Sequence, residues 1–148
     1  MYSLTLGTHN IVRWLVLAAG IWAVVRCWMG WRARSVWGEK DAGAVKLFVN
    51  ALSLQFVVGV VLYAVSPLIR GGLADMGAAM RTPSVRYFVV EHVFVMIAAI
   101  ALGHIGAARI RKAGSDSARF QTATIWMGLA LAAAVGFVPW DRPILPSF

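Results

Sequence analysis

Four long apolar stretches, separated by short polar segments, dominate the chain. Each is long enough to cross the roughly 30 Å of hydrocarbon in a lipid bilayer as a helix. Backbone polar groups inside a bilayer must be satisfied within their own segment, so an α-helix is expected for each stretch. The pattern therefore predicts an all-α fold, a single transmembrane domain with four spanning helices that run up-down-up-down over about 4–30, 45–66, 85–109 and 119–138.

Prolines mark the ends of three of these predicted spans. Pro67 follows the second span, Pro83 precedes the third, and Pro139 closes the fourth. The connection over 67–84 is the longest, and it is long enough to form a short helix lying on the membrane. Residues 141–148 are expected to form a surface extension.

Composition agrees with a protein that is solvated by lipid. The chain has 148 residues, 60% of them hydrophobic, and its mean hydropathy is +0.74. It therefore has more apolar surface than one soluble core of this size can bury. The net charge is +8, but the basic residues lie at the ends of the apolar stretches, which indicates membrane topology and not nucleic-acid binding.

Lys and Arg are concentrated in the loops after the first and third spans. These loops and their flanks hold Arg32, Arg34, Lys40, Lys46, Arg109, Arg111, Lys112 and Arg119. Short loops rich in Lys and Arg stay on the cytoplasmic side of a membrane. We therefore expect both basic loops to be cytoplasmic and both termini to lie on the outer side.

A few polar residues lie inside the predicted spans, where each carries a substantial free-energy cost. They include His9, Arg13, Gln55, Glu91 and His92. At roughly 1.5 Å per residue, both histidines are about 10 Å below the outer helix ends. The five residues are therefore expected to form a cluster in the outer half of the bundle, where any function should be sought.

Two imidazoles at one depth on different helices are what a haem b with two histidine ligands needs. On this hypothesis His9 and His92 are the metal ligands, Arg13 binds a propionate or a quinone carbonyl, and Glu91 handles protons or supports a ligand. A second haem would need four histidines, and the chain has three.

An alternative is that the same residues have purely structural roles. His9 can be an interfacial residue, His92 can belong to a buried network in which Glu91 pairs with Arg13, and His104 is expected near the inner surface. The single cysteine, Cys27, excludes an intramolecular disulfide. The sequence contains no P-loop, nucleophile elbow or zincin motif.

Several fragments of the chain resemble small four-helix bacterial membrane proteins that are labelled cytochrome b-like. The matching fragments are His9-x-x-x-Arg13-Trp14, Leu54-Gln55-x-x-x-Gly59, Arg86-Tyr87-Phe88 with Glu91-His92, and Gly103-His104. The resemblance covers most of the chain and implies a location in the bacterial inner membrane. Relatives carry a histidine before the Leu-Gln pair, where this chain has Ser53.

The leading hypothesis is a redox-associated membrane protein that binds one haem b or a quinone in the outer half of the bundle. It would act as an electron carrier or as the membrane anchor of a partner protein. Two alternatives are a non-catalytic accessory subunit of a larger membrane complex, and a proton-coupled small-solute transporter that works as a homo-oligomer through a polar cavity around Glu91.

Overall fold

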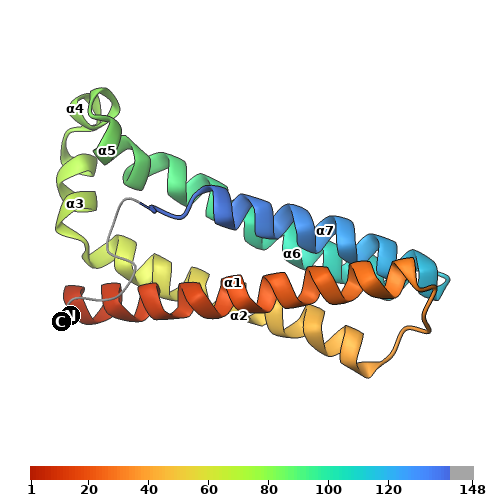
Figure 1. The fold of residues 1–148 in the computed structure, drawn as a ribbon. Helices are drawn as coiled ribbons and strands as arrows, with labels where there is room; N and C mark the ends of the chain where they lie inside the picture. The colour runs from red at the N-terminus through yellow and green to blue at the C-terminus, as the bar shows by residue number, and fades with distance from the viewer. Residues whose placement is uncertain (141–148) are drawn as a thin grey trace.

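The computed structural model of the chain describes residues 1–140, and these residues form helices joined by short connections (Figure 1). Four long helices run alternately up and down: α1 (Tyr2–Arg32), α2 (Glu39–Val65), α6 (His92–Lys112) and α7 (Asp116–Gly136). The predicted all-α fold is thus confirmed over the described part. The surface extension predicted for 141–148, and the C-terminus with it, lies outside the described residues.

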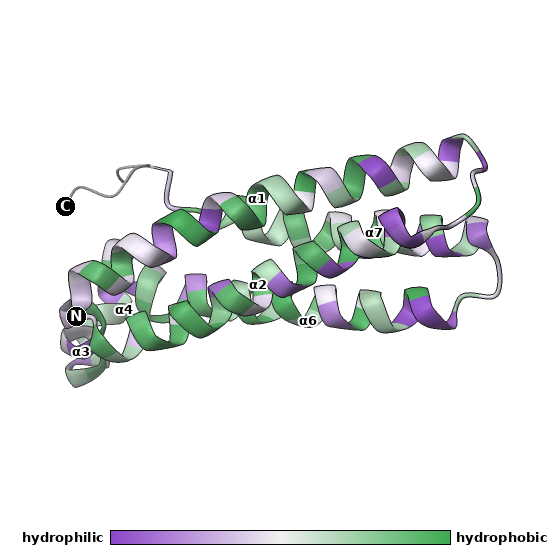
Figure 2. Cartoon of the chain, turned by 90° about the horizontal axis from the view of Figure 1, so that it is seen from below, coloured by the Kyte–Doolittle hydropathy of each residue, from purple (hydrophilic) through white to green (hydrophobic). Residues whose placement is uncertain are grey.

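Three helical stretches within residues 1–140 are long and apolar enough to cross a membrane. They are α1, α2 and the continuous stretch Pro83–Lys112, which ends with α6. Figure 2 shows apolar residues along these helices and hydrophilic residues gathered at the connections. The helix α7 is not among the three, because its first turns carry polar residues such as Arg119 and Gln121.

The predicted loop over 67–84 contains three short helices at one end of the bundle: α3 (Pro67–Ala74), α4 (Met76–Arg81) and the start of α5 (Pro83–Arg86). Pro67 and Pro83 occupy first-turn positions, where the missing amide hydrogen costs nothing. The carboxylate of Asp75 accepts a hydrogen bond from the Ala78 amide at 2.9 Å and caps α4.

At the opposite end, α2 begins six residues earlier than the apolar stretch predicts. The buried carboxylate of Asp41 accepts a hydrogen bond from the Gly38 amide at 2.9 Å, which caps the first turn. The same carboxylate binds Arg26 of α1 at 2.8 Å. The ion pair and the cap together join the ends of α1 and α2.

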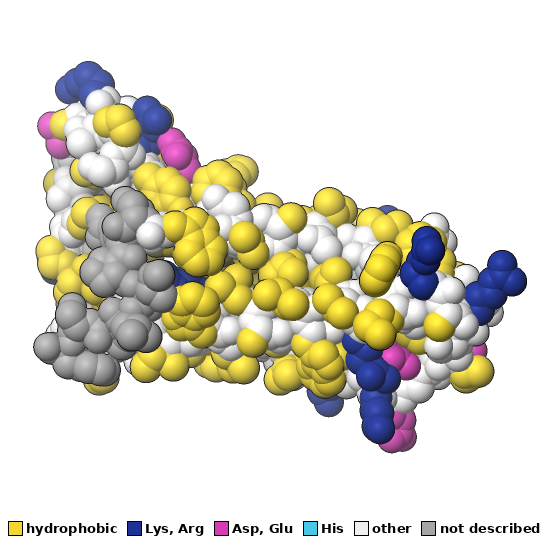
Figure 3. Space-filling view, in the orientation of Figure 1, with side chains coloured by type: hydrophobic (Ala, Val, Ile, Leu, Met, Phe, Trp, Pro, Cys, Tyr) yellow, Lys and Arg dark blue, Asp and Glu magenta, His cyan; other side chains and the backbone are white. Residues whose placement is uncertain are grey.

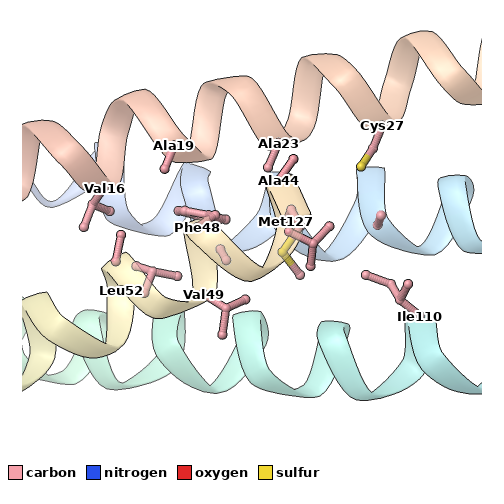
Figure 4. Packing of buried hydrophobic residues seen from close by; sticks show 14 of the residues in the cluster. Val16, Ala19, Ala23, Cys27, Ala44, Phe48, Val49, Leu52, Ile110 and Met127 are labelled. Atoms are coloured by element: carbon pink, nitrogen blue, oxygen red, sulfur yellow. The ribbon is translucent and has the colours of Figure 1, made fainter. Parts of the chain in front are cut away.

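The packed core joins α1, α2 and α7 through small residues (Figure 4). Ala19, Ala23 and Ala44 are almost fully buried, so the helix backbones approach closely around Phe48 and Met127.

Close packing also joins α6 to α7. A Cβ atom built on Gly106 would overlap the Trp126 side chain, so glycine is required for this approach of the two helices.

The two helix pairs separate toward α3. In Figure 1 the α1–α2 pair and the α6–α7 pair spread apart at that end, and α3 to α5 connect them. The buried hydrophobic cluster lies mostly away from this end.

Candidate functional site

A cavity of about 160 Å³ lies between the helix pairs near α3. Residues of α1, α2, α6 and the end of α7 line it, and most of its wall is apolar. Four of the five predicted site residues are in the wall: His9, Arg13, Gln55 and His92. We call this space the histidine cavity.

The two histidines face each other from α1 and α6. Their ring centres are 6.4 Å apart, and the ring planes meet at 70°. The structure therefore brings together the two imidazoles that the sequence places at one depth.

The side-chain amide of Gln55 fixes the orientation of His9. Its nitrogen donates to the His9 main-chain carbonyl at 3.1 Å, which identifies that end of the amide as the NH₂ group. The same nitrogen lies 3.2 Å from Nε2 of His9, so Nε2 is the acceptor and a neutral His9 carries its proton on Nδ1. Nδ1 of His9 and Oε1 of Gln55 are buried and have no hydrogen-bond partner among residues 1–140.

His92 is held by the end of α7. Its Nδ1 lies 2.8 Å from the Phe137 carbonyl oxygen, which can only accept, so Nδ1 is the donor. The hydroxyl of Tyr87 donates to the same oxygen at 2.7 Å. Carbonyls in the last turn of a helix have no partner within it, and here two side chains of the neighbouring helix supply the donors. The Nε2 of neutral His92 is consequently an acceptor.

A π-helical turn, η1 (Tyr87–Glu91), immediately precedes His92, whose amide donates to the Tyr87 carbonyl. The hydroxyl of Tyr63 in α2 donates to the Val89 carbonyl at 3.0 Å and gives this widened turn a further donor. Turns of this kind are frequent at functional sites. Neither the turn nor the roles of Tyr63 and Phe137 follow from the sequence pattern, because each depends on contacts between helices.

Glu91 does not line the histidine cavity. Its carboxylate binds Arg86 at 2.6 Å, and both side chains are about two fifths exposed. The structural alternative in which Glu91 pairs with Arg13 is not seen, because the Glu91 carboxylate binds Arg86, five positions earlier and next to the π turn. The transporter hypothesis placed a polar cavity around Glu91, and Glu91 is not among the residues that line the histidine cavity.

Arg13 brings a positive charge to the wall of the cavity. The residue is 8% exposed, and its guanidinium lies 5.6 Å from the ring centre of Trp14. A buried arginine within a helix able to span a membrane is costly, which marks it as a functional candidate.

His104 lies at a different place from the other two histidines. Its Nε2 is 3.0 Å from the hydroxyl oxygen of Ser53, so the pair links α6 to α2. His104 is exposed and lines a second space nearer the α1–α2 connection. It was expected near the inner surface, and its bond to Ser53 could not be predicted from either residue alone.

The described residues fit a haem incompletely. His92 has the arrangement of a metal ligand, with one nitrogen bonded to a carbonyl and the other available. His9 does not, because its Nε2 accepts from Gln55. The volume of the histidine cavity, about 160 Å³, is close to that of an engineered cavity of about 150 Å³ that holds one benzene ring. Haem b stays a prediction from the sequence.

No set of three or more His, Cys, Asp or Glu side chains within residues 1–140 is arranged to hold a metal ion. Comparison of the chain with protein-family models, curated proteins and solved structures finds no match. The function is therefore argued from the geometry of the cavity.

Proposed function

We propose that this chain is a small integral membrane protein that binds the head group of a quinone in the histidine cavity. One observation carries the proposal: a cavity of single-ring size has an apolar wall that also holds donors and acceptors. Ligand sites for small molecules commonly combine apolar walls with a few placed polar groups.

The polar groups match the two oxygens of a quinone. Carbonyl oxygens of the oxidised form accept hydrogen bonds, which the guanidinium of Arg13 and the Nδ1–H of His9 can donate. Hydroxyls of the reduced form donate, and Nε2 of His92 and Oε1 of Gln55 can accept. A bound quinone takes up or releases two electrons and two protons at these oxygens.

In this proposal each residue has a separate task. His92 holds or releases a proton at Nε2, while its bond to the Phe137 carbonyl keeps the ring in place. The charge of Arg13 stabilises negative charge on the neighbouring oxygen. His9 and Gln55 orient the head group, and electrons reach it from a redox partner. The chain would thus serve as an electron carrier or as the membrane anchor of that partner.

The proposed topology has four spans, with the histidine cavity in the outer half. The 21 residues of α7 extend about 31 Å at 1.5 Å per residue, which is close to the thickness of the hydrocarbon layer. Both basic connections, α1–α2 and α6–α7, then face the cytoplasm of a bacterial inner membrane. Tyr2 and the end of α7 are on the outer side.

The proposal is tested on full-length protein purified in detergent from a quinone-producing host. We expect a quinone in the organic extract, with an ultraviolet band that changes on borohydride reduction, in nearly equal molar amount to the protein. His92→Leu should lose most of this quinone. His104→Leu, which removes a histidine outside the cavity, should retain it.

Other outcomes favour the alternatives. Absence of quinone from the extract, together with no binding of an added short-chain quinone, would overturn the proposal. A Soret band that disappears in His92→Leu would replace the quinone by haem b. A fixed partner protein, with no cofactor and unchanged assembly in His92→Leu, would favour the accessory-subunit hypothesis.

A further inference from the structure

The end of the bundle opposite α3 carries a large excess of positive charge. Nine of the fourteen Lys and Arg residues, but only three carboxylates, belong to the connections α1–α2 and α6–α7 and to the helix turns beside them. Figure 3 shows dark blue side chains gathered toward this end. The positive-inside rule accounts for the excess, but not for where individual cations lie on the surface.

An open groove with a volume of about 600 Å³ lies between α2 and α6 at this end. No carboxylate of the described residues lines it. Its polar lining consists of cations and hydrogen-bonding side chains from α2, α6 and α7, namely Lys46, Asn50, His104, Arg111 and Arg119. We call it the basic groove.

Contacts between α2 and α6 explain why the groove exists. The helices touch where Gly103 faces Leu52, since a Cβ on Gly103 would lie 3.2 Å from that leucine side chain. The Ser53–His104 bond adds a polar link at this level. From there toward the basic connections, the two helices leave room for the groove.

The carboxylates at this end leave most of the groove's charge uncompensated. Glu39 and Asp41 do not line the groove, and Asp41 binds Arg26; Asp116 lies 3.7 Å from Arg119 in an exposed, long ion pair. Within residues 1–140, no carboxylate is within ion-pair distance of Lys46 or Arg111. The groove therefore presents a net positive charge to whatever occupies it.

The surface around the groove suits a lipid ligand, because apolar side chains lie beside the cations. Leu47 and Ile105, which follow groove residues in sequence, are each more than two fifths exposed, so apolar surface adjoins the cations. Basic pockets between spanning helices on the cytoplasmic side bind the head groups of anionic lipids. We propose that the basic groove binds the phosphate of an anionic phospholipid from the inner leaflet, with the acyl chains along the apolar surface beside it. This inference rests on the proposed topology, which places the basic connections inside, and does not depend on what the histidine cavity binds.

The test compares lipid retention by full-length variants. Protein is reconstituted in bilayers of equimolar phosphatidylcholine and phosphatidylglycerol, released into detergent, and analysed by native mass spectrometry. In Lys46→Gln/Arg111→Gln, we expect the ratio of bound phosphatidylglycerol to free protein to fall about tenfold, as for two partly exposed charge contacts. Arg32→Gln/Lys40→Gln has the same loss of charge at the same end outside the groove, and should retain the lipid.

Three outcomes would overturn the proposal. Equal loss of lipid in both double variants would show general attraction between the basic end and the membrane. Equal retention of phosphatidylcholine and phosphatidylglycerol by the wild type would remove the preference for an anionic head group. Binding of inorganic phosphate in the groove, with no retention of phosphatidylglycerol, would assign the groove to a soluble phosphate compound. Circular dichroism of both double variants confirms that each remains folded.

Discussion

Nδ1 of His92 donates a hydrogen bond to the main-chain carbonyl of Phe137, 2.8 Å away, and so ties α6 to the end of α7. The bond fixes both the tautomer and the direction of the imidazole at the wall of the histidine cavity. The same carbonyl also accepts a hydrogen bond from the hydroxyl of Tyr87, so the contribution of this carbonyl to stability can be measured apart from the role of His92 in the cavity. Each donor can be removed in turn.

Tyr87→Phe should lower stability and leave quinone binding nearly unchanged. It removes one hydrogen bond to the Phe137 carbonyl, which is worth about 1 kcal/mol, and Tyr87 does not line the cavity. His92→Leu removes the other bond but should also weaken binding by at least about tenfold. Thermal unfolding in detergent and titration with a short-chain quinone distinguish the two effects. Equal affinity in both variants would contradict the role given to His92.

Gln55→Leu should destabilise the bundle by about 1–3 kcal/mol. The substitution removes the donor to both the His9 carbonyl and its Nε2, and leaves the imidazole without that partner. Asn50→Leu is a matched control on the same helix, because Asn50 is exposed. Chemical unfolding measures the free energy of unfolding of both variants. A Gln55→Leu protein as stable as Asn50→Leu would show that the amide does not hold His9.

Gly106→Ala should cost about 1–3 kcal/mol through overpacking, because the new methyl group would overlap Trp126. Gly128→Ala in α7 is the control. A Cβ there meets nothing within 4 Å, so this change should be neutral or stabilise the protein by up to about 1 kcal/mol. The order of the two melting temperatures decides whether α6 and α7 approach as closely as described.

Glu91→Gln should change little. The Arg86–Glu91 pair is partly exposed, and such pairs contribute at most about 1 kcal/mol. Glu91 lies outside the histidine cavity, so quinone affinity should stay within about twofold of the wild type. Solute-driven proton flux in liposomes that Glu91→Gln abolishes would instead support the transporter alternative.

Cysteine labelling in intact cells tests the proposed orientation. In a Cys27→Ala background, Gly71→Cys in α3 should react with a membrane-impermeant maleimide, and Gly114→Cys between α6 and α7 should react only after the cells are opened. Neither glycine has a neighbour within 4 Å of an added Cβ, so both substitutions should be tolerated. The reverse pattern would place the histidine cavity in the inner half.

Much of the histidine cavity was predictable from depth along the helices. His9 and His92 meet because α1 and the stretch Pro83–Lys112 begin at the same end of the bundle, which places residues at equal distances from that end side by side. The rotation of each helix about its axis was not predictable, since spans apolar on all sides do not reveal which face packs inward. Glu91 illustrates this: pairing with Arg13 was one structural alternative, but the π turn before His92 changes the helical register, and the Glu91 carboxylate binds Arg86.

The sequence by itself determined the helical class, the lengths and approximate ends of the helices, and the separation of basic connections from the end with polar residues in its spans. These properties depend on local composition and on the requirement that backbone groups be bonded within each apolar segment. Only the tertiary structure decided which polar atoms meet: Gln55 with His9, Phe137 with His92, and Ser53 with His104. Such pairs depend on helix rotation and spacing, which glycine and alanine contacts between distant segments establish.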